Sequence, residues 1–406
     1  MTKTILIVGT YDTKDAELRF LKGVINDQGG GVLTMDVSVL KDPVQATDFS
    51  KHDVAKAGDS SIEAAIACDD ENLAMQIMSL GASRLAGQLH ADQKIHGVVI
   101  LGGSMGTDLA LDVCLALPLG VPKYIVSTIA FSPLLPPERI PADVQMILWA
   151  GGLYGLNGIC KASLSMAGGA VLGAAKAVQL PDPNKPMVGM TSFGKTAMKF
   201  MVTLKPELEK RGYEVAVFHP TGMGGRAFET LVAQGRFACV LDLATQEVGN
   251  HLFGSQVTAG PDRLTNAGLS GVPQIVAPGC HDLVDIPGWR PLEDRWQDHD
   301  THAHNRLLTS IVLNDGERRE VARAHAEKLA LAKGKSAFIM PLRGCHEWDR
   351  EGAPLHNASG VAAFADTLRA EISETTEWIE LDAHINDAAF CDKVLEVFDA
   401  WFGTSG

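Results

Sequence analysis

The stretches "KTILIVGTYDTKDA", residues 3–16, and "KPMVGMTSFGKTAM", residues 185–198, open the two halves of the chain in the same way. Each runs from a lysine through a short apolar segment to a threonine, and a second lysine follows four residues later. These pairs are Thr10 with Lys14 and Thr191 with Lys195. An apolar run that ends in such a turn is typical of a strand leading into a helix, so the two stretches predict a repeated α/β unit.

The second opening contains "GMTSFGKT", residues 189–196, which fits the Walker A phosphate loop letter for letter. Such a loop needs a buried strand directly before Gly189 and small residues inside it. Pro186 leaves only two apolar residues for that strand, and Phe193 is bulky. Because the first opening lacks the template, we interpret the second as a strand-to-helix turn with Gly189 inside the strand. Asp242, at the end of "ACVLDL", resembles a Walker B acid but is equally typical of any α/β strand.

Apolar β-branched runs alternate with amphipathic segments along both halves, which predicts crossovers and mainly parallel sheets. Strands are expected at 4–8, 31–39, 97–101, 123–128 and 143–149, then at 187–192, 214–219, 238–243, 273–277 and 336–341. Helices are expected at 15–27, 61–88, 108–117 and 161–178, then at 197–211, 227–234, 318–332, 360–372 and 387–402. The expected fold is two Rossmann-like, doubly wound domains with a cleft between them: a nucleotide-binding domain over 1–180 and a second domain over 187–406, joined by a proline-rich linker at 181–186.

Composition narrows the class of protein. The chain has 406 residues with a net charge of −14, so a phosphate-backbone partner or an anionic membrane is not expected. Its seven cysteines are scattered and never spaced as C-x-x-C, which favours a reducing compartment. The apolar stretch 164–178 is shorter than a membrane span, and no leader-like segment opens the chain. We expect a cytoplasmic protein without nucleic-acid or membrane partners.

Candidate ligand contacts stand where strands end, since parallel sheets bind ligands beyond their carboxyl edges. The turn "GTYDTK" offers backbone, hydroxyl, cation and metal-ligand groups, and "GGSMGT" has the glycines and hydroxyls of a phosphate nest before a helix. "HPTGMGGRAFE" gives the second half a similar glycine-rich turn. The predicted cofactor contacts are Gly9, Thr10, Asp12, Thr13, Lys14, Asp36, Gly102, Gly103, Ser104, Gly106, Thr107, Thr191, Gly194, Lys195, Thr196, Gly222, Gly224, Gly225 and Arg226. Asp36 would accept ribose hydroxyls, while an ordinary helix cap at Asp12 or Thr13 is the alternative at the first turn.

Three polar clusters in the second half favour a different chemistry. They are "APGCHDLVDIPGW" (277–289), "DHDTHAHNR" (298–306) and "RGCHEWD" (343–349), which together offer Cys280, His281, Asp282, Asp285, His299, Asp300, His302, His304, Arg306, Cys345, His346 and Glu347. Such residues could hold a metal or pair a cysteine nucleophile with a histidine, although none has a recognised ligand spacing. Capped helices beside a polar cleft are the structural alternative.

Ten motifs along the whole chain resemble a known family. They are, in order, "GTYDTK", "GGSMGT", "GLNGI", "GMTSFGKT", "HPTGMGGRAFE", "VLDLATQEV", "AGPDRL", "GVPQIVAPGCHD", "HNR" and "DAHINDAAF". The chain is similar to an uncharacterised bacterial family that shares its domain with the ATP-binding region of a plant tobamovirus-resistance protein. The resemblance implies a two-domain α/β protein that binds ATP, with a homodimer as its assembly. Met105 in the nest and the Cys-His pairs of "GCHD" and "GCHEWD" depart from the small residues expected there.

Together with the glycine-rich turns, the resemblance implies ATP and Mg²⁺ as cofactors, with phosphoryl transfer or ligation on a small metabolite as the reaction if the protein is an enzyme. Lys14 and Lys195 would neutralise phosphate charge, and Asp12 would help to hold the metal. One alternative is an ATP-independent hydrolase or lyase that uses His281, Asp282 and their neighbours. Another is a non-catalytic regulatory module. The first prediction depends on the helix starts after Gly9 and Gly102 sharing one crevice.

Overall fold

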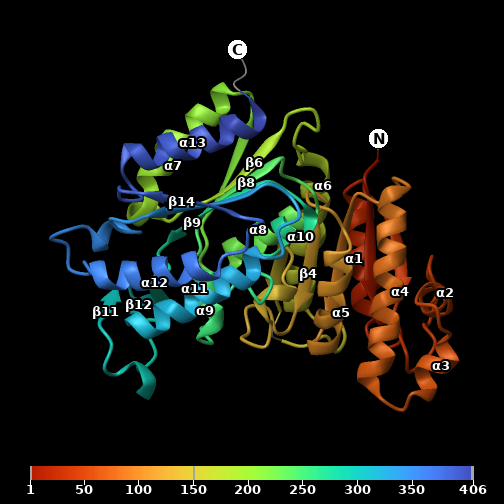
Figure 1. Ribbon diagram of the computed structural model, residues 1–406. Helices are drawn as coiled ribbons and strands as arrows, with labels where there is room; N and C mark the ends of the chain where they lie inside the picture. The colour runs from red at the N-terminus through yellow and green to blue at the C-terminus, as the bar shows by residue number, and fades with distance from the viewer. Residues whose placement is uncertain (1, 150, 404–406) are drawn as a thin grey trace. The chain divides into compact units, whose positions relative to one another are not determined.

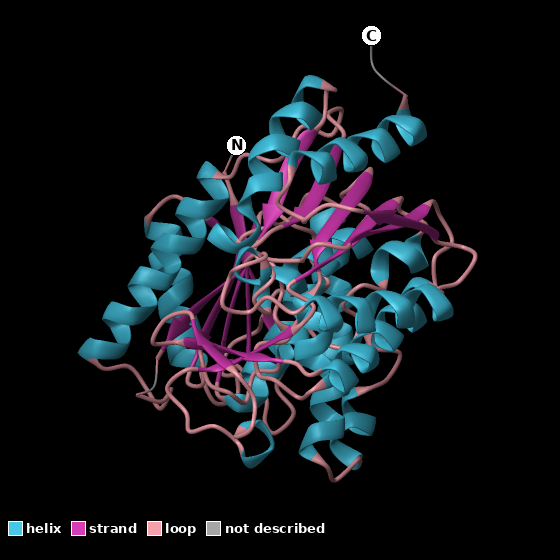
Figure 2. Ribbon diagram, turned by 60° about the vertical axis from the view of Figure 1, so that its left-hand side comes forward, coloured by secondary structure: helices cyan, strands magenta, loops and turns pink. Residues whose placement is uncertain are grey.

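Contacts divide the chain into Met1–Pro181, here called unit 1, and Asp182–Gly406, called unit 2. The computed structural model describes residues 2–149 and 151–403, except for the side chains of residues 195–198. Each unit has a mainly parallel sheet with helices on both faces (Figure 1 and Figure 2). The predicted class, two Rossmann-like α/β domains, is confirmed.

Unit 1 is built on five parallel strands in the order β2-β1-β3-β4-β5. These are β1 (Thr4–Gly9), β2 (Gly31–Asp36), β3 (Gly97–Gly102), β4 (Lys123–Ser127) and β5 (Val144–Leu148). Helices α1 (Asp15–Asp27) and α6 (Gly158–Ala177) cover one face, and α2 (Lys51–Ala57), α3 (Ile62–Ala67), α4 (Glu71–Ala91) and α5 (Ser104–Leu115) cover the other. The central strands are buried on both faces, which explains their continuous apolar runs.

Some unit 1 helices differ from their predicted bounds. The helix expected over 61–88 is two helices, because the chain turns at Asp69, whose φ is +49°, and Asp70 then caps α4 through the amides of Asn72 and Leu73. The helix expected from 108 begins at Ser104, directly after the glycine turn. Helix α2 was not predicted.

Helix α6 is longer than the apolar stretch seen in the sequence. By length and composition alone it could cross a membrane, but core helices of soluble proteins pass the same test. Its buried side chains, among them Cys160, Leu164 and Val171, pack in the apolar core between α1 and the sheet. The small residues of α6 therefore serve close packing inside unit 1.

Unit 2 repeats this topology with six parallel strands in the order β7-β6-β8-β9-β13-β14. These are β6 (Met187–Thr191), β7 (Glu214–Phe218), β8 (Cys239–Ala244), β9 (Gln274–Gly279), β13 (Ser336–Pro341) and β14 (Glu377–Leu381). Helices α7 (Gly194–Lys210) and α13 (Ala388–Phe402) lie together on one face in Figure 1, with α11 (Asp315–Leu329) and α12 (Ala358–Glu371) on the other. Shorter elements of unit 2 are α8 (Met223–Ala233), α9 (Gln246–Leu252), α10 (Asn266–Ser270) and the 3₁₀ turns Asp294–Trp296 and Glu347–Asp349, and unit 1 has one 3₁₀ turn among its described residues, Pro137–Arg139.

Gly189 lies in the middle of β6, which confirms the interpretation of "GMTSFGKT" as a strand followed by a turn. A Cβ atom at Gly189 would come within 2.9 Å of the Phe237 ring and 3.0 Å of Phe228. The glycine is thus required by aromatic packing on the sheet. The first glycine of a Walker A loop would instead lie beyond the strand.

An antiparallel sheet of three strands is inserted between β9 and α11, and it was not predicted. Its strands are β10 (Leu283–Pro287), β11 (Thr301–Ala303) and β12 (Leu308–Val312), in the order β10-β12-β11. Asp285 lies opposite Ser310 in this sheet, and Val284 lies opposite Ile311. The apolar pair is buried in the core beneath α11, so the polar pair is presented on the opposite face.

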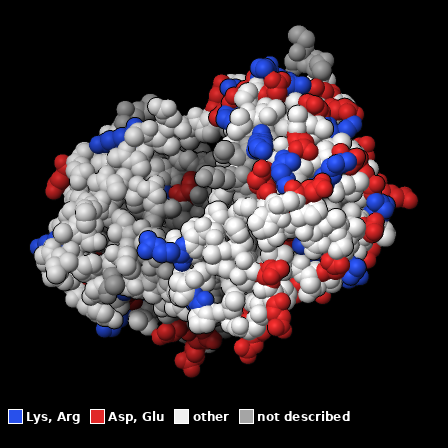
Figure 3. All heavy atoms as spheres, turned by 90° about the vertical axis from the view of Figure 1, so that its left-hand side faces the viewer, with Lys and Arg blue, Asp and Glu red and all other residues white. Residues whose placement is uncertain are grey.

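On part of one face of the molecule, charges of both signs lie among one another. On the face drawn in Figure 3, Lys and Arg side chains alternate with Asp and Glu side chains instead of gathering into a basic area.

Candidate functional site

The two predicted turns of unit 1 lie side by side at the carboxyl edge of its sheet. Strand β1 pairs with β3 in parallel, from Ile5 opposite Gly97 to Val8 opposite Ile100. The order β2-β1-β3 also makes this edge the point where successive connections leave in opposite directions. Open α/β sheets bind their ligands at such a switch point.

Helix α5 begins at this edge without a side-chain cap from the described residues. Its N-cap, Gly103, makes no side-chain cap, and its first turn holds no acidic residue. Ser104 and Met105 are exposed, whereas Thr107 is fully buried and bonds to the carbonyl of Gly103 (2.7 Å) and to Ser127 Oγ (2.7 Å). The turn is therefore rigid on its inner side and accessible on its outer side, with the partial positive charge of the helix start facing outward.

The neighbouring turn after β1 has a different character. Thr10 Oγ1 and Thr13 Oγ1 are 3.0 Å apart, and Lys14 Nζ donates to Thr13 at 3.3 Å. Lys14 is the N-cap of α1, so neither Asp12 nor Thr13 has the capping role considered from the sequence. The first turn of α1 carries Asp15 and Glu17, which makes it a poorer anion site than the start of α5.

The predicted acids of unit 1 hold loops together. Asp12 Oδ2 accepts from the amides of Leu40 and Lys41, both at 3.2 Å, while its buried Oδ1 has no partner among the described residues. Asp36 Oδ1 accepts from the amides of Tyr11 (3.2 Å) and Ser38 (3.0 Å). Asp36 is fully buried, which raises its pKa, so in this conformation it shapes the turn and does not face a ribose.

The glycine turn of unit 2, at Gly222–Arg226, already binds an acid of the protein itself. Glu247 Oε1 accepts from the amides of Gly222 (2.5 Å) and Gly225 (3.2 Å) at the start of α8. Arg226 Nη1 pairs with both carboxylate oxygens of Asp262, at 2.6 and 2.8 Å. A Cβ atom at Gly225 would overlap the Glu247 carboxylate. An external anion would therefore have to displace Glu247 here.

Glu247 belongs to a buried cluster around Arg263 that occupies the switch point of unit 2. The Arg263 guanidinium bonds to Glu247 (2.7 Å), Glu229 (3.2 Å) and both oxygens of Asp242. Burial raises the pKa of Glu229 and of Glu247 to about 7, although Arg263 opposes both shifts. One cation thus faces three buried acids.

Further predicted residues of unit 2 fall on this cluster or outside the described side chains. Thr191 is fully buried and donates to Asp242 Oδ1 at 2.7 Å, so Asp242 serves an ion pair and not a Walker B metal site. Gly224 packs against the His219 backbone inside the same turn. The side chains of Lys195 and Thr196 lie outside the described residues.

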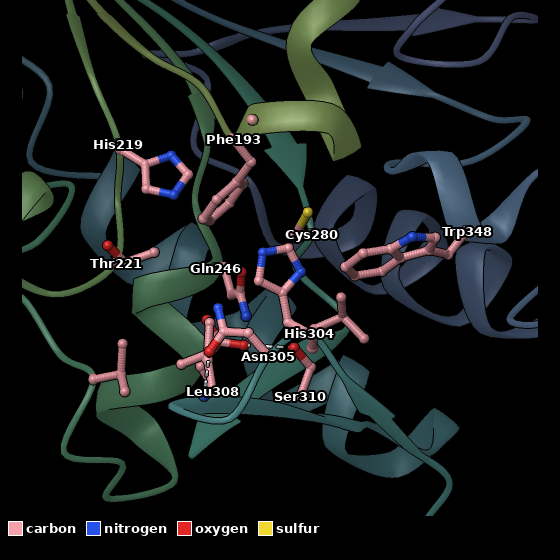
Figure 4. Close-up of a pocket in the computed structure, with 14 residues that line it drawn as sticks. Phe193, His219, Thr221, Gln246, Cys280, His304, Asn305, Leu308, Ser310 and Trp348 are labelled. Carbon is pink, nitrogen blue, oxygen red and sulfur yellow. Dashed lines mark hydrogen bonds between the residues drawn. The ribbon is translucent and has the colours of Figure 1, made fainter. Parts of the chain in front are cut away.

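A cavity of about 820 Å³ lies at the carboxyl edge of the unit 2 sheet. Four parallel strands, β6 to β9, end at this edge, and β10 and β12 cross it. Fourteen residues line it: Phe193, Gly194, His219, Thr221, Gln246, Val257, Cys280, Leu283, Asp285, His304, Asn305, Leu308, Ser310 and Trp348 (Figure 4). Its volume is in the range of cavities that hold small metabolites.

The interior of this cavity is polar and buried. Gln246, Asp285 and Ser310 are each at most 3% exposed, and Ser310 Oγ donates to Asp285 Oδ1 at 2.6 Å. Burial raises the pKa of Asp285, and the hydrogen bond from Ser310 limits that rise. Gln246 Nε2 lies near enough to lower the Asp285 pKa but has no partner at hydrogen-bonding distance among the described residues.

Two histidines stand at the exposed rim. His219 Nδ1 donates to the carbonyl of Ser192 at 3.1 Å, and this leaves Nε2 as the acceptor of the neutral ring. The His219 ring packs edge-on against Phe193, with 5.4 Å between ring centroids, and His304 packs against Trp348 at 5.9 Å. Figure 4 shows His219 and Phe193 on one side of the cavity and Trp348 on the other, with Gln246 and His304 between them.

The predicted catalytic pair His281 and Asp282 does not line the cavity. Both are buried; Asp282 accepts from His346 Nε2 (3.1 Å) and pairs with Arg318 (3.2 Å). Asp282, His346 and Asp349 lie close enough to hold a metal ion. The Arg318 and His346 contacts already neutralise Asp282, whose pKa they hold far below its usual value despite burial. The group is therefore an ion-pair network, in which Asp282 Oδ1, Arg318 Nη2 and His346 Nδ1 are buried without a hydrogen-bond partner among the described residues.

The remaining members of the polar clusters are dispersed. Cys280 lines the cavity with φ of +57°, but burial beside Asp282 and Asp285 raises the pKa of its thiol well above the usual value. His299 pairs with Glu317 at 3.0 Å, and His302 stacks on Trp348. Gln246 and Ser310 were not predicted as site residues. Gln246 follows β8 and lies with Thr221 of the predicted glycine-rich turn, and Ser310 reaches the cavity only through the insertion.

Comparisons with known proteins agree with this two-part construction. Residues 3–180 match the N-terminal domain, and residues 185–402 the C-terminal domain, of the uncharacterised protein family UPF0261. A UPF0261 protein of Brucella melitensis is 52% identical over 98% of this chain and 95% of its own length, and one of Clostridium tetani is 35% identical over 96% of both. The ToMV resistance protein Tm-1 of Solanum lycopersicum is 30% identical over 97% of this chain, which spans 55% of that protein.

Among solved structures, a Streptomyces glycosyltransferase complexed with thymidine diphosphate aligns over 97% of this chain and 99% of its own, at 13% identity. The TM-score of 0.19 is too low to relate the two folds. The matches to both family domains and the 52% identity are decisive, and the chain belongs to the UPF0261 family.

Proposed function

We propose that unit 1 binds ATP with Mg²⁺ at the edge between β1 and β3. The observation that carries this proposal is the start of α5, which has no capping side chain and no acid in its first turn. It stands at the switch point of the sheet, beside the turn of Thr10, Thr13 and Lys14. The oxygens of a polyphosphate can accept hydrogen bonds from the first amides of a helix, as a capping side chain would.

The roles of the neighbouring residues follow from their positions. The amides at Gly103–Gly106 and the Ser104 hydroxyl would receive phosphate oxygens, and Lys14 would neutralise charge from the facing turn. Asp12 fits the metal ion, since its Oδ1 is unpaired among the described residues while Oδ2 is fixed by two amides. Such an arrangement would support phosphoryl transfer or ligation on a small metabolite.

Calorimetric titration of the full chain with Mg·ATP tests the proposal. Gly103→Val fills the outer side of the turn, where a Cβ atom meets only Thr128 Oγ1 at 3.7 Å, and should weaken binding at least tenfold without unfolding the protein. The matched control is Gly173→Val on α6, where a Cβ atom meets nothing within 4 Å. Equal ATP affinity in the two variants would refute the proposed site.

A second candidate function is ATP-independent catalysis in the cavity of unit 2. The observation in its favour is Asp285, a buried acid with a raised pKa in a cavity that two histidines also line. Two kinds of titratable group in different environments suit general acid–base chemistry, as in a hydrolase or lyase. Cys280 does not suit the nucleophile role, because its raised pKa keeps the thiol protonated.

This second candidate predicts turnover without nucleotide. Asp285→Asn should remove at least 99% of any such activity, whereas Cys280→Ser should leave it within a few-fold of wild type. Activity that requires ATP would exclude the acid–base assignment. So would a result in which Cys280→Ser loses the activity while Asp285→Asn keeps it.

A further inference from the structure

We infer that the cavity of unit 2 is a binding site for a small hydroxylated carboxylate, held with its hydroxyl groups at the buried floor and its carboxylate at the histidine rim. This inference is independent of nucleotide binding in unit 1. It rests on how polar groups are distributed between the floor and the rim of the cavity.

The polar side chains on the floor of the cavity favour a ligand with hydrogen-bonding groups. Gln246, Asp285 and Ser310 are buried there, and only the Ser310–Asp285 bond is made among them at hydrogen-bonding distance. A buried amide without a partner is costly, and a ligand hydroxyl that accepts from Gln246 Nε2 and donates to Asp285 would satisfy both groups. An apolar ligand would leave the Gln246 amide unpaired.

The walls limit the size of the ligand. Phe193, Leu283, Leu308 and Trp348 provide apolar surface around the polar floor. A short carbon chain or a single ring can pack against these side chains while its hydroxyl groups reach the floor. An aromatic wall around a small floor of hydrogen-bonding groups is poorly suited to a long ligand or to one without hydroxyl groups.

The rim favours a single negative charge. His219 and His304 stand there with Asn305, and α7 begins beside them at Gly194 without a side-chain cap. None of the fourteen described lining residues is Lys or Arg, and the side chain of Lys195, which follows Gly194, lies outside the described residues. The Asn305 amide and the first amides of α7 are neutral donors, which match a carboxylate, whereas a phosphate dianion is usually met by Arg, Lys or a metal.

A matched series of ligands tests the chemical class on the full chain. C3–C7 hydroxycarboxylates, including D-gluconate, would be screened by thermal shift and titrated by calorimetry beside sorbitol, hexanoate and glucose 6-phosphate. We expect at least one hydroxycarboxylate to bind, and to bind at least tenfold more tightly than the neutral polyol, the deoxy acid and the sugar phosphate. Binding of no hydroxycarboxylate, or preference for the phosphate, would overturn the inference.

Variants locate the binding. Gln246→Leu should weaken the best hydroxycarboxylate 10- to 100-fold, with Gln234→Leu on an exposed helix end as the control. His304→Ala is exposed and so does not threaten the fold; it should weaken the carboxylate at least fivefold but leave sorbitol unchanged. Unchanged affinity in both Gln246→Leu and His304→Ala would place the ligand elsewhere and refute the site.

The two sites can fail separately. Mg·ATP titration of Gln246→Leu should give the wild-type affinity, and Gly103→Val should keep the wild-type affinity for the hydroxycarboxylate. A loss of hydroxycarboxylate binding in Gly103→Val equal to that in Gln246→Leu would contradict an independent site in unit 2.

Discussion

The turns that follow β3 in unit 1 and β8 in unit 2 hold the same place in the same strand order, yet they are used in opposite ways. After β3, Gly103 leads into α5 with no cap and no acid. After β8, Thr245 leads into α9, and Glu247 turns inward to Arg263 and the amides of Gly222 and Gly225. One topology can therefore present a helix start to solvent or fill the equivalent edge with its own charges.

The largest effect on stability is expected when Arg263, the cation of the buried cluster at the edge of the unit 2 sheet, is removed. Arg263→Met leaves Asp242, Glu229 and Glu247 buried without their partner, so unfolding free energy should fall by about 3–5 kcal/mol. Chemical denaturation measures this loss. The control is Arg295→Met, since Arg295 pairs with Glu293 at the surface and should cost at most about 1 kcal/mol. A similar loss in both variants would mean that the buried cluster contributes no more to the unfolding free energy than a surface ion pair.

The next effect depends on pH. The Glu247 pKa is raised from 4.5 to about 7, so the folded state binds the extra proton and this group's contribution to stability falls as pH rises from about 4.5 to 7. Wild type should lose up to about 3 kcal/mol relative to Glu247→Gln between pH 5 and pH 8.

Measuring the difference between the two proteins is necessary here. His281 and His325 have pKa values lowered to about 4 and about 3 by burial, and they stabilise the protein as pH rises over part of the same range. They are present in both proteins and cancel. A difference that stays constant or grows in favour of wild type toward pH 8 would be the opposite of the expected sign.

Adding one methyl group should distinguish the turns sterically. Gly225→Ala places a Cβ atom onto the Glu247 carboxylate and should cost about 2 kcal/mol, whereas Gly103→Ala meets only Thr128 and should cost under about 1 kcal/mol. Melting temperatures of the two variants provide the comparison. Equal losses would show that the turn at Gly103 is as tightly enclosed as the one at Gly225.

The smallest change in stability is expected when an acid is placed at the start of α5 in unit 1, as Glu247 stands at the start of α9 in unit 2. Ser104→Glu places a carboxylate in the first turn of α5, where the helix dipole should stabilise the fold by about 0.5 kcal/mol. The same charge should repel phosphate and weaken Mg·ATP at least tenfold. If the variant gains stability and binds Mg·ATP as tightly as wild type, the nucleotide does not bind at the start of α5.

Much of the fold could be predicted because buried parallel strands leave a clear signal. Continuous apolar runs gave the central strands of both units, and the lack of a Walker template in the first opening placed Gly189 inside β6. Edge strand β14 and the inserted strands escaped prediction, since they are short, carry charged residues or face solvent on one side.

The candidate sites were less predictable for a different reason. A glycine-rich turn looks the same in sequence whether it faces solvent, as at Gly103, or binds Glu247, as at Gly222 and Gly225. The partner acid lies 22 to 25 residues away, and no local spacing indicates the contact. Likewise, Asp285 and Ser310 meet Gln246 only because β10 and β12 fold back across the end of the sheet.

The shared strand order of the two units also bears on how such a chain diverges. Two halves of one ancestry would carry duplicate edges, so either edge could lose its original contacts while the other kept them. Once Arg263 and its acids were in place, single replacements would leave a charge stranded in the interior, and the route back to an open edge would be blocked. To give unit 2 an open edge like that of unit 1, at least four residues would have to change together, namely Arg263 and its partners Glu229, Asp242 and Glu247.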